Sequence, residues 1–156
     1  AWLAGRLLAL LSVVAAALLI ALAASVLAAL AMSRVRGLDT TAWWTSDGLT
    51  SAAVGYLNAL LAAAFFGVAG TALGVLVRST PVALAAGIAW MGPLEHLVQK
   101  ASGTATRVLP GLLFDAVARG GVPDVGYSQA LLTATAYAGI ALLVAFASFA
   151  RRDVTT

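Results

Sequence analysis

The sequence predicts an all-α, polytopic membrane protein: a bundle of four transmembrane helices with one short amphipathic helix. Of its 156 residues 62% are hydrophobic and 10% are charged, against about 25% charged residues in a typical soluble domain. So much apolar surface could not be buried in one small soluble core, and a disordered chain would need high charge and low hydrophobicity. The third observation is the placement of the charges, which divide the chain into long uncharged runs.

These uncharged runs define the expected spans. Three of them lie between Arg6 and Arg34, between Asp47 and Arg78, and between Asp124 and Arg151. Since a helix needs about 20 mostly apolar residues to cross the hydrocarbon core, each is long enough. A fourth run starts after Arg78 and reaches that length if Glu95 lies near its end. We expect one transmembrane domain over residues 1–156, with spans at about 6–32, 50–77, 81–100 and 128–150.

Residues suited to helix starts stand before three of the spans. Ser46 or Asp47 is expected to cap the second helix and Ser128 the fourth, because their side-chain oxygens can accept from free backbone N–H groups. Thr80-Pro81 supplies a cap and a proline at the first helical position for the third helix.

The arginines suggest an orientation. Four crossings put both termini on one side, together with cations in short segments close to the membrane: Arg6, Arg78, Arg151 and Arg152. The remaining cations are spread over two longer loops, so the positive-inside rule places the termini in the cytoplasm. In the first of these loops, Trp43 and Trp44 are expected at the lipid headgroups, with substrate stacking as the alternative.

The second outer loop contains the short amphipathic helix, expected at about residues 107–119. Its apolar face follows helical spacing through Leu109, Leu112, Leu113, Ala116 and Val117. Asp115 and Arg119 form an i, i+4 pair on the polar side, Thr106 is the expected cap, and Gly120-Gly121 can end the helix. Because the segment is too short to cross a bilayer, we expect it in the interface or as a re-entrant turn.

Within the spans, Glu95 and His96 are the candidate functional groups, since ionisable residues in membrane helices are costly. Gly92-Pro93 just before them should kink the helix and free backbone carbonyls. A kinked helix with Gly92, Pro93, Glu95 and His96 could line a translocation path. Alternatively, both polar groups lie near the headgroups, within about a turn of Lys100.

The second span contains small residues at helical spacing, including Gly67, Gly70 and Gly74. Small residues four apart allow close helix packing in lipid. We expect them to pack within the bundle, with a dimer face as the alternative.

The sequence lacks the motifs that several kinds of chemistry require. The sequence has no G-x-x-x-x-G-K-[ST] phosphate loop, no H-E-x-x-H zinc motif and no G-x-S-x-G nucleophile elbow, so the chain is not expected to be an enzyme or to hydrolyse ATP. One histidine beside one glutamate, with no cysteine, does not fill a metal coordination shell, and the nine cations show no dense patch for nucleic acid. No cofactor is expected in this chain.

Four segments and their order along the chain match the pattern of a known family. They are Gly5-Arg6-Leu7-Leu8-Ala9, the run from Leu73 to Thr80, Leu109-Pro110-Gly111, and the run from Phe149 to Val154. Together they resemble the permease subunit of bacterial type-2, exporter-like ATP-binding-cassette transporters. In that family they would be the entry to the third helix, the turn between helices four and five, the external re-entrant helices, and the cytoplasmic ending.

The resemblance implies that this chain contains the last four of six helices and is a fragment of a longer permease in the bacterial plasma membrane. It implies a second permease copy, as a homodimer or heterodimer, and separate ATPase subunits that bind ATP and magnesium. Arg6 and Arg78 would lie near the ATPase. The alternatives are a small non-transport membrane protein for assembly, anchoring or immunity, and a lipid-modifying membrane enzyme that would depend on Glu95 and His96.

Overall fold

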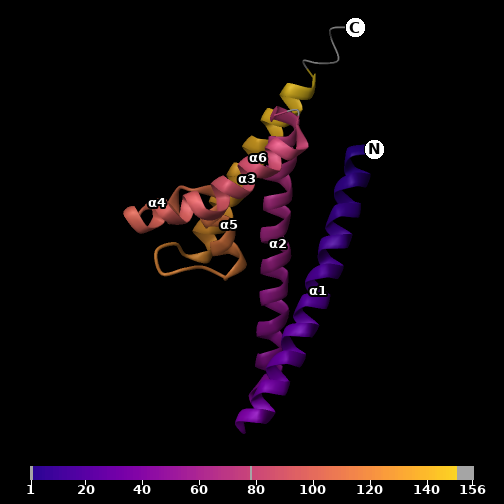
Figure 1. Cartoon of the computed structure of the whole chain (residues 1–156), viewed down its shortest axis with the longest axis vertical. Coiled ribbons are helices and arrows are strands. Elements are labelled where there is room, and N and C mark those ends of the chain that lie inside the picture. Colours follow the sequence, from indigo (N-terminus) through magenta and orange to yellow (C-terminus); the bar gives the residue numbers. More distant parts are fainter. Residues whose placement is uncertain (1, 78, 151–156) are drawn as a thin grey trace. The chain divides into compact units, whose positions relative to one another are not determined.

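The computed structural model describes the backbone of residues 2–77 and 79–150, and it describes side chains except those of 2–4, 6, 7, 10, 149 and 150. The described chain is all-α, as predicted (Figure 1). Its long helices are α1 (Trp2–Arg36), α2 (Ser46–Val77), α6 (Tyr127–Ala150) and a broken helix of three consecutive pieces. These pieces are α3 (Thr80–Ala89), the π-turn η2 (Trp90–Leu94) and α4 (Glu95–Ala101). The short helix is α5 (Pro110–Ala118), and two 3₁₀ turns, η1 (Thr41–Trp44) and η3 (Ala105–Arg107), complete the set.

Four helices of the described chain are long and apolar enough to cross a membrane. These are Leu11–Arg36, Ser46–Val77, Thr80–Ala101 and Tyr127–Ser148. They confirm the four predicted spans, and the protein is therefore a multi-pass membrane protein by helix length and hydropathy. The chain divides by its contacts into residues 1–60 and 61–156, which we describe separately.

The first part contains α1 and the beginning of α2. A long-range polar contact joins them here, because the Tyr56 hydroxyl donates to the Ala15 carbonyl at 3.1 Å. The most apolar 18-residue stretch of α1 has no residue buried by the chain itself.

The connection between α1 and α2 is built from local caps. Gly37, with a φ of 64°, ends α1, and Leu38 N–H donates to Ser33 O at 2.9 Å. Asp39 accepts from the backbone N–H and the hydroxyl of Thr41, and these bonds lower the pKa of its carboxyl. Thr45 caps α2 by accepting from Gly48 N–H at 3.2 Å, so the predicted cap at Ser46 or Asp47 is wrong by one or two residues.

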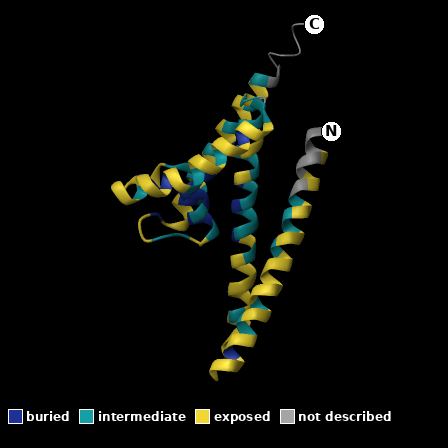
Figure 2. Ribbon diagram, in the orientation of Figure 1, coloured by how far each residue is buried: buried dark blue, intermediate teal, exposed yellow. Residues whose placement is uncertain are grey.

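The second part holds the core, which gathers around α5 (Figure 2). Four α5 residues are buried with Phe65 of α2 and with alanines of α6: Leu113, Phe114, Ala116 and Val117. The Phe114 ring stacks on Phe65 at 5.5 Å between centroids and meets Phe66 edge-on at 5.1 Å. The predicted apolar face of the short helix is thus buried against protein.

Three predicted starts of helices are displaced. Ser79 stands at the cap position of α3 without a side-chain bond, so Thr80 is already helical. The carbonyl of Gly126 accepts from Ala130 N–H, so α6 starts before the predicted cap Ser128. Thr106 does not cap α5, because its hydroxyl accepts from Gln99 of α4 at 3.0 Å.

Two predicted features of α5 are confirmed. Gly120 and Gly121 end the helix with φ of 74° and 109°, values that favour glycine, and Gly121 N–H donates to Ala116 O at 2.8 Å. Asp115 and Arg119 form the expected ion pair, with 2.9 Å between Oδ2 and a guanidinium nitrogen.

Candidate functional site

The break in the third span arises from Pro93. Proline has no backbone N–H to continue the α-helical ladder, and its ring crowds the preceding turn. The chain responds with a π-turn over Trp90–Leu94, after which Glu95 N–H reaches back to the carbonyls of Trp90 and Gly92. The predicted kink is therefore present as a widened turn, a feature found frequently at functional sites.

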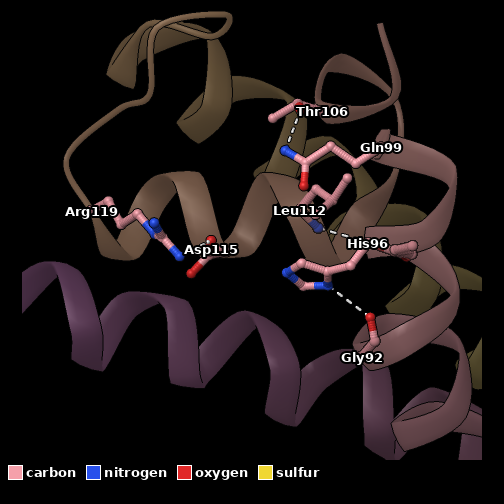
Figure 3. Close-up of polar contacts among 8 residues, drawn as sticks. Gly92, His96, Gln99, Thr106, Leu112, Asp115 and Arg119 are labelled. Atoms are coloured by element: carbon pink, nitrogen blue, oxygen red, sulfur yellow. Dashed lines mark hydrogen bonds and ion pairs between the residues drawn. The ribbon is translucent and has the colours of Figure 1, made fainter. Parts of the chain in front are cut away.

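His96 folds back onto this break. Its Nδ1 lies 2.7 Å from the Gly92 carbonyl oxygen, which is the distance of a hydrogen bond (Figure 3). The imidazole is exposed on α4. The His96 side chain thus contacts the backbone of the π-turn, whereas the Glu95 side chain makes a different contact.

Glu95 is buried, with 1% of its surface exposed. Its Oε2 accepts from the backbone N–H of Leu112 at 2.9 Å. Leu112 is the third residue of α5, whose first turn has backbone N–H groups without helical partners. Leu109, at the cap position of α5, makes no side-chain cap bond. Glu95 therefore caps α5 from a different helix.

Gly111 makes this cap sterically feasible. A Cβ atom at this position would lie 2.6 Å from Glu95 Oε2, closer than real contacts allow, and 3.0 Å from the Met91 Cβ, which is unusually tight. The glycine lets the carboxyl approach the start of α5, where the helix dipole also favours negative charge. The sequence indicated Glu95 as a candidate but not its partner, because the partner is a backbone group 17 residues away.

The segment before α5 contacts α6 within the helix. The Tyr137 hydroxyl donates to the Val108 carbonyl at 2.6 Å. Tyr137 lies ten residues after the start of the span Tyr127–Ser148, which corresponds to about 15 Å along a helix. Whether the short helix lies in the interface or is re-entrant stays a prediction.

Alanines of α6 provide the surface on which α5 lies. Ala130, Ala134 and Ala138 are spaced by four residues and are 0%, 0% and 9% exposed. Such small residues let two helix backbones approach closely. Sequence reasoning singled out a stripe of this kind only in the second span and missed the one in α6, although the same spacing is present there.

The small residues predicted for the second span have a different surrounding. A Cβ atom on Gly70 or Gly74 would meet nothing within 4 Å. Both glycines line a largely apolar cavity of about 470 Å³ between α2, α3 and the π-turn. Gly87 and Gly92 also contribute to its wall, whereas Gly67 does not. A packing role for Gly67, Gly70 and Gly74 stays a prediction.

The four predicted path residues have different surroundings, and their role in a path stays a prediction. Gly92 lines the apolar cavity, Glu95 faces α5, and Pro93 and His96 are exposed. Arg78 lies outside the described residues, and for Arg6 only the backbone, within α1, is described. Among the described residues, no three His, Asp or Glu side chains gather as a metal site would require.

The contact between Tyr137 and Val108 gives a first testable prediction. Tyr137→Phe removes the hydroxyl and leaves the Val108 carbonyl without this donor, so we expect the free energy of unfolding in micelles to fall by about 1 kcal/mol. The measurement is denaturant unfolding followed by tryptophan fluorescence. Tyr56→Phe removes the hydroxyl contact to Ala15 instead, and should leave the α5 region protected from proteolysis. In Tyr137→Phe we expect faster proteolysis of the 102–126 segment. Equal proteolysis of this segment in both variants would contradict a role of the Tyr137 hydroxyl in holding it.

Comparisons with models of known families, with curated proteins and with solved structures found no match. The structure by itself supports an integral membrane protein with four spans. It adds a short helix, α5, whose start is capped by a buried carboxyl and which follows a broken span.

Proposed function

We propose that this chain is the permease component of a type-2, exporter-like ATP-binding-cassette transporter. In this proposal it provides an efflux path for substrate, using ATP that is bound with magnesium and hydrolysed by a separate subunit. The observation that carries the proposal is the short helix α5, which is capped by Glu95 of the broken helix α3–η2–α4 and packs on α6, and which we take to be re-entrant.

Membrane anchors have no need for such a segment. Non-helical backbone at membrane depth is tolerated only where protein buries it or where it lines a water-filled cavity. In this proposal residues 102–109 enter the membrane, and contacts to Glu95, Gln99 and Tyr137 satisfy part of their polar groups and those of α5. Broken helices and re-entrant segments are typical of proteins that move polar groups across a bilayer.

The remaining features have roles in this proposal. Gly92 and Pro93 would allow the path-facing helix to bend, with Glu95 and His96 next to the bend. Arg6 and Arg78 would face the ATPase on the cytoplasmic side. The exposed apolar surface of α1 suits further helices, including those of a second permease copy.

The test is affinity purification of the full-length protein from its native membrane. We expect an ATP-binding-cassette ATPase to co-purify, and deletion of the gene to change the efflux of at least one compound.

The substitution Pro93→Ala provides a backbone N–H at the π-turn. It should leave the ATPase bound while lowering transport at least about tenfold, equivalent to about 1.4 kcal/mol.

A matched control is Pro81→Ala at the start of α3, where a missing N–H breaks no helical bond. It should transport normally. Failure to recover any ATPase, together with unchanged efflux after deletion, would contradict the proposal. That result would favour the non-transport alternative, an assembly, anchoring or immunity protein.

A further inference from the structure

The Glu95 carboxyl has one oxygen that the cap does not use. Oε2 accepts from Leu112 N–H, whereas Oε1 is fully buried and has no hydrogen-bond partner among the described residues. A charged carboxylate in an apolar interior is costly unless its oxygens are satisfied. Oε1 is therefore an open acceptor in an apolar interior, where a proton could bind.

The other oxygen, Oε2, holds the first turn of α5. Its hydrogen bond from Leu112 N–H is stronger when the acceptor carboxyl is charged than when it is neutral. The strength of the contact between Glu95 and Gly111-Leu112 therefore depends on the charge of the carboxyl.

We propose that Glu95 is a proton-binding site whose charge state controls how firmly the short helix α5 is held on α4. One proton from water binds Oε1 and returns to water on release, with no other bond made or broken. The ionised carboxylate holds the start of α5. The neutral carboxyl holds it less firmly, because its bond to Leu112 N–H loses the contribution of the charge.

The other titratable groups of the packed elements have contacts of their own or are exposed. Asp115 and Arg119 of α5 pair with each other, Arg107 of η3 donates to the Asp124 carbonyl, and the Tyr137 hydroxyl of α6 donates to Val108 O. On α4, His96 contacts Gly92 O, and Lys100 is exposed. Tyr127 is exposed at the start of α6, and residues 61–77 of α2 contain no titratable side chain. The hydrogen bond that holds the Glu95 carboxyl therefore comes from the backbone of α5.

Infrared difference spectroscopy tests the proton site directly. The full-length protein in lipid nanodiscs is titrated with acid, and the band of protonated carboxyl groups is recorded. We expect a component that is present in the original protein and completely lost in Glu95→Gln, because glutamine keeps an acceptor oxygen but binds no proton. Asp115→Asn removes an exposed carboxyl of the same region and should retain this component.

A distance measurement tests the control of α5. The protein has no cysteine, so Leu97→Cys and Val108→Cys give two unique positions for spin labels on exposed residues of α4 and of the segment before α5. Acidification should lengthen and broaden the distance distribution, with the same midpoint as the infrared component. Glu95→Gln should show the acid-type distribution at every pH.

Two outcomes would overturn the proposal. One is an infrared titration that is unchanged in Glu95→Gln, which would show that Glu95 binds no proton in the range studied. The other is a distance distribution that does not respond to pH while the infrared component titrates, which would separate proton binding from α5. Neither outcome depends on an ATPase or on transport, so this proposal and the proposed function can fail independently.

Discussion

Replacing Gly111 by alanine should lower the free energy of unfolding by about 2 kcal/mol, because it leaves a buried backbone donor of α5 unsatisfied. The new Cβ would lie 2.6 Å from Glu95 Oε2 and 3.0 Å from the Met91 Cβ, so the carboxyl has to shift, and we expect it to leave Leu112 N–H. We then expect the start of α5 to detach from α4. Denaturant unfolding in mixed micelles measures the loss, and proteolysis within 102–126 reports the detachment.

Intrinsic helix propensity predicts the opposite sign for this substitution, since alanine is favoured over glycine by up to about 1 kcal/mol within a helix. Gly139→Ala in α6 is the matched control, because a Cβ there would meet nothing within 4 Å. We expect Gly139→Ala to be neutral or stabilising. Stabilisation by both substitutions would show that the Glu95 carboxyl does not depend on the space at Gly111.

Replacing Ala134 by leucine should be the most disruptive change in α6. Ala134 is fully buried in the cluster that contains Leu113, Phe114 and Val117 of α5. Three added carbon atoms have no free space there, and overpacking of this kind costs about 1–3 kcal/mol. We expect reduced stability and faster proteolysis of the 102–126 segment, measured in the same two assays.

Ala136→Leu makes the same chemical change two residues away on an exposed position of α6. Its leucine would face lipid, which is as apolar as the side chain itself, so we expect an effect within about 0.5 kcal/mol. If Ala134→Leu were equally mild, α5 could not be packed on the alanine stripe of α6. Rescue of Ala134→Leu by Val117→Ala would further support direct packing between the two helices.

The four long helices follow from local information. Long uncharged, apolar runs leave few alternatives to membrane spans, and the broken turn follows from Pro93 alone. The C-terminal end of α5 at Gly120-Gly121 was equally predictable, because two adjacent glycines supply the positive φ values that such an end requires. The starts of α2 and α3 were less predictable. Thr45 and Ser79, at the cap positions, lie next to residues of similar capping preference, and the sequence alone did not show which residue would take the cap position.

The periodicity of Leu112, Leu113, Ala116 and Val117 showed that one face of α5 is apolar, but it carried no information about what covers that face. Lipid and protein are similarly apolar, so both choices satisfy the same pattern. Only the packing of residues 61–150 placed this face on Ala130, Ala134 and Ala138 and brought Glu95 to the start of α5. Spans depend on the composition of consecutive residues, whereas the cap on α5 depends on a glycine, a carboxyl and a backbone N–H that meet only after the helices pack.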